Sequence, residues 1–356
     1  MQPTISFEVW VIILLFATIL VMALYSVYSR KRVISDEDKP YLMALKYMAE
    51  GENRLAVEKF KEAVRENSSN IDAYLKLGTI LRNEGLYKNA IRIHQDLTLR
   101  GNLGSSELTE VKKNLILDYW YLKDYTKAEY YLNQLKDDKN LIDWTTPYLV
   151  KILEKKGEWQ QAVETLSKSS LAREQKGKFK IAQLKVKQGI KLANSQREKD
   201  ARILFKESMK TDHECAEAYL QLGDSYLREG RTTDAINAWT DLCKKVREKA
   251  HLAFDRLEKA WFEKGQFSKI EELYMSMLQE DEDFLPAIIA LSEIYRKKGD
   301  FDQSLKLLQG AQKRDLDSDL IQSQIAKVRM DKGQYKEAAT VALELLSKEN
   351  RIEGTN

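Results

Sequence analysis

Side chains able to support acid–base, nucleophilic or metal chemistry are few in this 356-residue chain, and they are scattered. Its histidines are His94, His213 and His251, and its cysteines are Cys215 and Cys243. A zinc site needs closely spaced Cys and His ligands, and a disulfide framework needs more cysteines. We therefore expect no metal, no cofactor, no catalytic site, and two cysteines buried in the core. His94 is expected to be a partly buried packing residue.

Motifs that hold phosphates or zinc in enzymes are also absent from the sequence. It contains no G-x-x-x-x-G-K-[ST], G-x-G-x-x-G or H-E-x-x-H. Adjacent carboxylates such as Glu271 and Glu272 fall at helix or turn positions that face solvent. The 58 Lys and Arg nearly balance the 55 Asp and Glu, and a net charge of +3 argues against a nucleic-acid surface. The sequence therefore favours a protein that is not an enzyme and has no nucleic-acid or evident small-molecule partner.

The N-terminal part of the chain carries a long uncharged stretch. Residues 9–28 contain no charged side chain, and about 20 apolar residues are enough for a helix to cross the hydrocarbon core of a bilayer. We therefore predict a transmembrane helix over residues 9–29, after a short extracytoplasmic segment of residues 1–8. A cleaved secretory signal is the alternative, but it would carry its positive charges before the apolar stretch and end in small residues.

The charges beside this stretch predict its orientation. Arg30, Lys31 and Arg32 follow it, whereas the preceding flank carries only Glu8. Lys and Arg near a membrane span stay in the cytoplasm, so these three residues should fix the orientation from a juxtamembrane linker of residues 30–36. The sequence thus predicts a single-pass protein of a bacterial inner (cytoplasmic) membrane, with the rest of the chain on the cytoplasmic side.

A repeated pattern divides the rest of the chain. A glycine is followed five residues later by a small residue, and most units lie 34 residues apart. Glycine suits the turn between two helices because it adopts positive φ at little cost. The pairs are Gly51 with Ala56, Gly85 with Ala90, Gly157 with Ala162, Gly230 with Ala235, Gly299 with Ser304, and Gly333 with Ala338; Gly265 with Ile270 fits less well, and residues 124–128 and 195–201 are degenerate copies.

Between these turns, apolar and small residues recur at the spacing of amphipathic helices. Leu77, Gly78 and Leu81 belong to one such stripe, and Gly78 should let the second helix of the pair approach closely. The order of aromatic, Leu, Gly, aromatic and Ala at this period resembles the tetratricopeptide repeat. It predicts an all-α superhelical solenoid of about nine helix pairs over residues 37–350, with loops lengthened after the second and fourth repeats, and a tail of residues 351–356.

The first helix of each pair should line a concave inner face, which is the usual binding surface of such a solenoid. Several side chains on this face are apolar where a merely solvated surface would be charged. Packing against an adjacent helix is the alternative for each of them. The predicted partner-binding residues are Leu75, Arg82, Lys113, Trp120, Lys151, Val186, Ile190, Leu220 and Phe262, and Thr79, Asp224 and Asp255 share this face.

The second repeat carries a more specific motif. After the turn at Gly85, residues 90–97 read A-I-R-I-H-Q-D-L, which is not general repeat consensus. With the anchor, the basic stop and the number of repeats, this motif resembles the lipopolysaccharide assembly protein B (LapB) family. The resemblance implies a membrane-anchored adaptor that joins the protease FtsH to the deacetylase LpxC and so regulates lipid A synthesis through proteolysis. A general scaffold for an envelope, secretion or pilus complex is the alternative function.

Members of that family usually end in a rubredoxin-type metal domain built on two C-x-x-C pairs. Cys215 and Cys243 form no such pair and lie in the sixth repeat, so neither this domain nor its metal is expected in the chain. An adaptor that lacks the domain and a shorter relative with another client are both compatible with this pattern.

Overall fold

The computed structural model describes residues 16–22, 39–101, 103–314, 316 and 318–353, and every regular element in these ranges is a helix. By internal contacts the chain divides into two compact units, Met1–Ile152 and Leu153–Asn356. The prediction of an all-α repeat protein is confirmed for the described residues.

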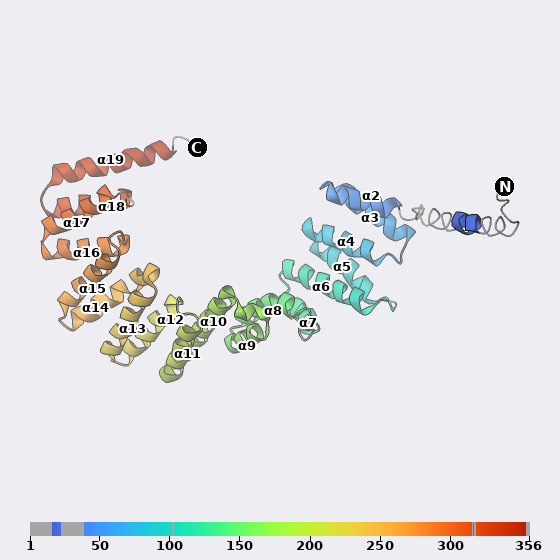
Figure 1. Cartoon of the computed structure of the whole chain (residues 1–356), viewed down its shortest axis with the longest axis horizontal. Helices are drawn as coiled ribbons and strands as arrows, with labels where there is room; N and C mark the ends of the chain where they lie inside the picture. The colour runs from blue at the N-terminus through green and yellow to red at the C-terminus, as the bar shows by residue number, and fades with distance from the viewer. Residues whose placement is uncertain (1–15, 23–38, 102, 315, 317, 354–356) are drawn as a thin grey trace, which may run out of the picture. The chain divides into compact units, whose positions relative to one another are not determined.

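In the first unit, consecutive helices form pairs that pack side by side (Figure 1). Helix α4 also contacts α6, so the first helices of neighbouring pairs lie against each other. The helices are α2 (Lys39–Ala49), α3 (Asn53–Glu66), α4 (Ile71–Asn83), α5 (Tyr87–Thr98), α6 (Ser105–Tyr121), α7 (Tyr125–Asn133) and α8 (Ile142–Lys156), whose last turn belongs to the second unit.

The second unit continues the same pairing, and α10 contacts α12 as α16 contacts α18. Two short 3-10 helices, η2 (Ser170–Arg173) and η3 (Arg247–Ala253), precede first helices of pairs. The α-helices are α9 (Trp159–Lys168), α10 (Gln175–Asn194), α11 (Glu198–Thr211), α12 (Ala216–Arg228), α13 (Thr232–Lys245), α14 (Phe254–Glu263), α15 (Phe267–Glu280), α16 (Leu285–Lys298), α17 (Phe301–Lys313), α18 (Ser318–Asp331) and α19 (Tyr335–Glu353).

The turn inside each helix pair is held by one residue with positive φ. The seven predicted glycines have φ between 68° and 84°, and in the two degenerate copies Lys123 (64°) and Gln196 (61°) take this conformation. The residue five positions later is buried at every turn, including Ala128 and Ala201. The predicted repeat is therefore confirmed, and Gly265 is a full member. Successive turn residues lie 34 apart except for intervals of 38, 39 and 35 residues, which accommodate the longer connections.

Three first helices carry a glycine on which a ring from the second helix rests. An added Cβ would meet ring atoms at 2.2 to 2.5 Å, so any larger residue would force the two helices apart. The predicted role of Gly78 is thereby confirmed. The three contacts are Gly78 with His94, Gly189 with Phe205, and Gly223 with Trp239.

The apolar core is distributed along the stack as separate clusters between neighbouring helices. Trp239 and Tyr274 are among the bulkiest members in the second unit, and each has no exposed side-chain surface. Cys215 and Cys243 are 2% and 3% exposed, which confirms them as core residues. Burial raises the pKa of the Cys243 thiol to about 12, so this side chain is a neutral packing group near pH 7.

The predicted transmembrane helix of residues 9–29 lies outside the described residues except for 16–22, which are helical and exposed. Arg30, Lys31 and Arg32 also lie outside them. Over the part of the chain that the structure describes, no helix combines the length and the apolar character needed to cross a bilayer. The anchor and its orientation remain predictions.

Candidate partner-binding surfaces

An open groove of about 870 Å³ lies against the first helices of the last three repeats, in the second unit. We call it the inner groove. Its lining combines apolar side chains with carboxylates, lysines and one arginine. It consists of His251 from η3, Phe254, Asp255 and Glu258 from α14, Leu285, Pro286, Ile289, Ala290, Glu293, Arg296 and Lys297 from α16, and Leu320, Gln324, Lys327, Met330 and Asp331 from α18.

The repeat pattern determines which residues reach this groove. Ile289, Glu293 and Arg296 lie ten, six and three residues before the turn residue Gly299. These spacings place the three side chains on one face of α16, because residues three and four apart are neighbours on a helix surface. The same positions are those from which the partner-binding residues were predicted.

Ion pairs hold the charged part of the groove. Arg296 donates to both carboxylate oxygens of Glu293, at 2.5 and 2.8 Å, and also pairs with Asp331 of α18. These hydrogen bonds from Arg296 hold the pKa of Glu293 below its usual range. The groove wall formed by α16 and α18 is thus cross-linked, and Lys297 and Lys327 supply further positive charge in its lining.

A second hollow of about 510 Å³ adjoins the turn between α14 and α15, and we call it the anchor hollow. Phe262 is 66% exposed and Phe267 50% exposed, and their rings meet edge to face with centroids 5.1 Å apart. Large aromatic side chains exposed together mark interaction sites. The lining comprises Glu258, Lys259, Phe262 and Glu263 of α14, Phe267 and Ile270 of α15, and Ile294, Lys297 and Lys298 of α16.

Glu258 lines both the inner groove and the anchor hollow. The hydroxyl of Tyr274, which is fully buried on α15, donates to Glu258 Oε1 at 2.5 Å. Burial and this hydrogen bond raise the pKa of Tyr274, so the hydroxyl keeps its proton. Glu258 stands seven residues before its turn, as Gly78 and Gly223 do. The Tyr274 ring on the second helix therefore holds the Glu258 carboxylate in the lining that the two hollows share.

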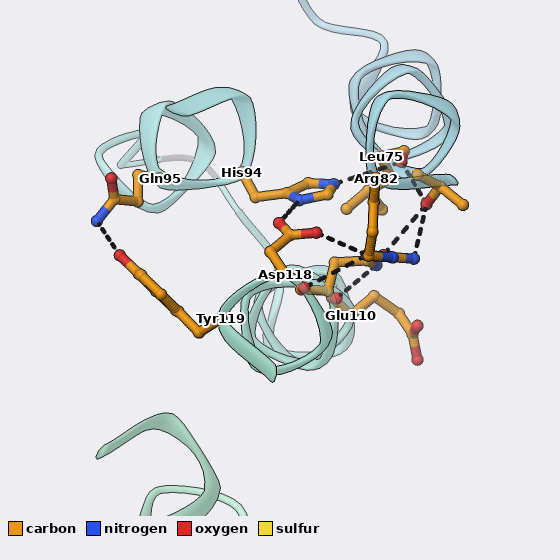
Figure 2. Close-up of polar contacts among 9 residues, drawn as sticks. Leu75, Arg82, His94, Gln95, Glu110, Asp118 and Tyr119 are labelled. Atoms are coloured by element: carbon orange, nitrogen blue, oxygen red, sulfur yellow. Dashed lines mark hydrogen bonds and ion pairs between the residues drawn. The ribbon is translucent and has the colours of Figure 1, made fainter. Parts of the chain in front are cut away.

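A buried polar network joins the second and third repeats in the first unit (Figure 2). Asp118 and His94 have no exposed side-chain surface, and Arg82 is 7% exposed. Arg82 donates to Asp118 Oδ1 at 2.8 Å and to Asn114 Oδ1 at 3.1 Å, while His94 Nδ1 donates to Asp118 Oδ2 at 2.6 Å. A His–Asp pair can serve acid–base catalysis where a substrate reaches it. Here the three side chains are closed off from solvent. Their contacts join α4, α5 and α6, which is a structural role.

Six of the predicted partner-binding residues pack against neighbouring helices. Arg82, Val186 and Leu220 are 7%, 2% and 5% exposed. Leu75, Trp120 and Ile190 are partly buried against apolar clusters, and Trp120 stacks edge on with two tyrosines.

Of the other predicted residues, Lys151 and Phe262 are exposed and Lys113 is partly buried. Lys113 Nζ donates a hydrogen bond to Glu110 Oε1 at 2.7 Å, and Lys151 lies on α8. Phe262 lines the anchor hollow, and Asp255, from the same predicted face, lines the inner groove. Of the predicted residues, these two are the ones that the structure places in an open hollow.

Sequence reasoning missed most of the lining of both hollows. Ile289, Lys327 and Met330 stand at the inner-face positions of the last two repeats. The repeat register used for the earlier repeats, extended to the end of the chain, predicts them. Phe267 begins the second helix of its pair, and an apolar residue directly after a turn was the available signal.

Profiles of the tetratricopeptide repeat match residues 41–101, 217–248 and 262–328. The helix pairs in these stretches are tetratricopeptide repeats. The last stretch includes all of α16 and most of α18, which line the inner groove, but only the last two residues of α14.

The chain is similar to lipopolysaccharide assembly protein B of Escherichia coli (strain K12), with 23% identity over 276 residues, 75% of this chain and 71% of that protein. It is also similar to lipopolysaccharide assembly protein B of Haemophilus influenzae, with 23% identity over 239 residues, 63% of this chain and 60% of that protein. A solved structure described as the APC/C hetero-tetramer Cut9-Hcn1 aligns over 88% of this chain and 87% of the matched chain, at 12% identity and a TM-score of 0.32.

Proposed function

We propose that this chain is a non-catalytic adaptor in lipopolysaccharide assembly that binds client proteins through its tetratricopeptide repeats. The observation that carries the proposal is the similarity to lipopolysaccharide assembly protein B over 75% of the chain. The name lipopolysaccharide assembly protein B describes the matched proteins, and we propose the same role for this chain.

The inner groove is the surface that supports a binding role. It is open, it is lined from three consecutive repeats, and ion pairs hold Glu293, Arg296 and Asp331 in place before any partner arrives. Binding to such a preformed surface requires little ordering of the protein, which leaves more of the interaction energy for affinity.

In the proposed mechanism, residues 9–29 hold the chain in a bacterial inner membrane, and Arg30, Lys31 and Arg32 keep the repeats on the cytoplasmic side. Tethering raises the effective concentration of the repeats near membrane-bound partners without any new contact. By family resemblance, the partners are the FtsH protease and the LpxC deacetylase. The adaptor would then promote membrane-protease turnover of an enzyme of lipid A synthesis.

The test is the half-life of that enzyme after protein synthesis is stopped, followed by immunoblot in the source bacterium. Deleting the gene for this chain should lengthen the half-life, and the full chain should restore it. A variant lacking residues 1–36 should bind the enzyme through its repeats but fail to restore turnover, because it lacks the proposed membrane anchor.

An unchanged half-life, with no envelope protease copurifying, would reject the proteolysis mechanism. The repeats would then be better explained as a general scaffold for assembly of an envelope, secretion or pilus complex. Identification of the copurifying proteins distinguishes these two outcomes.

A further inference from the structure

We propose that the anchor hollow is a docking site for a protein segment that presents an apolar side chain flanked by Asp or Glu. This inference rests on the proposed adaptor function, because it gives the chemistry of the client segment. The partner's apolar side chain would contact Phe262 and Phe267, and its acidic side chains would contact the lysines around them.

The apolar part of the hollow is built to cover a side chain. Phe262 and Phe267 form one wall at the end of the α14–α15 pair, and Ile270 and Ile294 contribute from α15 and α16. Ile270 is only 6% exposed and is fixed in a core cluster, so the base of the hollow is rigid. A partner side chain seated there would remove the exposed faces of both phenylalanines from water, and this burial drives association.

The charges around the hollow favour an acidic partner. The lining holds the lysines Lys259, Lys297 and Lys298 beside Glu258 and Glu263, and Lys298 is already paired with Glu271 of α15, so Lys259 and Lys297 are the lysines that remain for a partner. Glu258 is already engaged by the buried Tyr274 hydroxyl. The lysine side chains are exposed at the rim, where complementary charges increase the rate of encounter and select the correct partner.

Lys297 is the cation that connects both hollows. It lies 3.8 Å from Glu293, whose two oxygens are already bonded to Arg296, and its side chain is 60% exposed. A segment with its apolar residue in the anchor hollow would reach Lys297 and could continue along the inner groove, since the two hollows share this residue and Glu258.

The concave shape favours a protein segment over a lipid surface. Exposed phenylalanines beside lysines also occur on proteins that bind anionic membranes. A bilayer surface is smooth on the scale of a hollow of about 510 Å³ and would leave its base unfilled, whereas one protruding side chain fills it.

The test uses the purified full chain in detergent and two fluorescent probes. One probe is a short helical peptide of Leu, Ala and Glu, and the other is its counterpart with every Glu replaced by Lys. Fluorescence anisotropy should show the Glu peptide binding at least about tenfold more tightly than the Lys peptide. Phe262→Ala should weaken binding of the Glu peptide about tenfold or more, as expected for loss of a central aromatic anchor.

Two further variants make the result specific. Lys259→Glu combined with Lys297→Glu should reverse the preference, so that the Lys peptide binds more tightly. Tyr335→Ala is the matched control, because Tyr335 is an aromatic side chain of similar exposure, 69%, on α19. It should leave the binding of both peptides unchanged.

Several outcomes would overturn the proposal. They are absence of binding by either peptide, equal binding of both, no effect of Phe262→Ala, or an equal loss with Tyr335→Ala. Displacement of the peptide by phosphatidylglycerol vesicles in a Phe262-dependent manner would assign the site to a membrane. A dimer in light scattering that Phe262→Ala dissociates would assign it to a second copy of the chain.

Failure of this inference is distinguishable from failure of the proposed function. The peptide experiment reads binding in the purified protein, and the half-life experiment reads turnover in the cell. A normal lengthening of the half-life with no peptide preference would leave the adaptor role in place and remove only this docking site.

Discussion

Arg82 and Phe262 stand at the same position in their repeats, three residues before the turn residues Gly85 and Gly265. Arg82 is 7% exposed because Asp118 of the next repeat accepts its hydrogen bond, whereas Phe262 is 66% exposed beside an open hollow. Repeat position therefore predicts the face that a side chain occupies. The residues of the following repeat determine whether that face is closed or open to a partner.

The rings of the second helices show the same dependence in the core. His94 and Trp239 rest on equivalent glycines, and Trp239 Nε1 donates to the Leu220 carbonyl at 3.3 Å. His94 has a second polar nitrogen, which is satisfied by buried Asp118. At the position of Asp118, the seventh repeat has Ala260, which is 3% exposed. The polar ring of His94 is thus matched by a buried carboxylate from the next repeat, and the larger ring of Trp239 by a small apolar residue.

The largest stability effect is expected from Asp118→Ala. It would leave the Arg82 guanidinium buried without its carboxylate and His94 Nδ1 without its acceptor. Breaking a buried ion pair by removing one partner costs about 3–5 kcal/mol. Chemical denaturation should show this loss, and hydrogen exchange should place it in α4, α5 and α6, because stability in a repeat stack is shared between nearest neighbours.

The control for this prediction transfers the residues of the sixth and seventh repeats into the second and third. Leu227, Trp239 and Ala260 stand where Arg82, His94 and Asp118 stand. The triple variant R82L/H94W/D118A should be more stable than Asp118→Ala alone by at least about 1 kcal/mol, because no buried charge is left unpaired. Additive losses would contradict the equivalence of the two sets.

The next effect concerns the ring that rests on Gly223. Gly223→Leu should destabilise the second unit by about 1–3 kcal/mol, since even a Cβ would lie 2.2 Å from Trp239 Nε1. Thermal melts measure the loss. Gly230→Leu would not serve as its control because φ is 72° there, whereas Gly310→Ala is suitable, since the nearest atom to an added Cβ is an Arg314 nitrogen at 3.6 Å. An unchanged melting temperature for Gly223→Leu would mean that the repeat register is wrong.

Acid should weaken the second unit through three carboxylates. Hydrogen bonds from Arg228 and Arg296 lower the pKa of Glu198 and Glu293. For Glu154, burial acts to raise the pKa, but contacts with two lysines outweigh it and the pKa is lowered. Since each folded pKa lies below the ordinary 4.5, their contribution is present above that pH and is lost as the pH falls through the folded values. Urea midpoints should decline below about pH 4.5, and Glu198→Gln should flatten that decline.

The smallest stability effect is expected from Phe262→Ala. An exposed substitution away from caps and buried contacts changes stability by no more than about 0.5 kcal/mol, and Phe262 is 66% exposed. The melting temperature should therefore match that of the unaltered chain. A large loss would show that the Phe262 and Phe267 pair supports the fold rather than a partner.

Much of the fold could be predicted from the sequence because its signals are local. Positive φ at the turn and a small residue five positions later need only short-range reasoning, so the helix pairs and their register were predicted even where Lys123 and Gln196 replace glycine. The start of α10 at Gln175 was less clear, because η2 and a longer connection precede it.

The site was harder to predict because exposure depends on the next repeat. Val186 and Leu220 have inner-face positions, yet neighbouring helices cover them. The contact from Tyr274 to Glu258 also had no sequence signal, since a carboxylate occupies a position that is glycine in three other repeats. Such pairings involve residues on different helices and become evident only when the helices are packed.

The half-life of the lipid A enzyme in cells that carry Phe262→Asp tests the central claim most directly. In a strain lacking the native gene, the full chain with this exposed substitution should be present at normal levels but leave the enzyme as long-lived as in the deletion, because a charge in the anchor hollow prevents client docking. Tyr335→Asp, at a similarly exposed aromatic, should restore normal turnover. Normal turnover with Phe262→Asp would contradict the account.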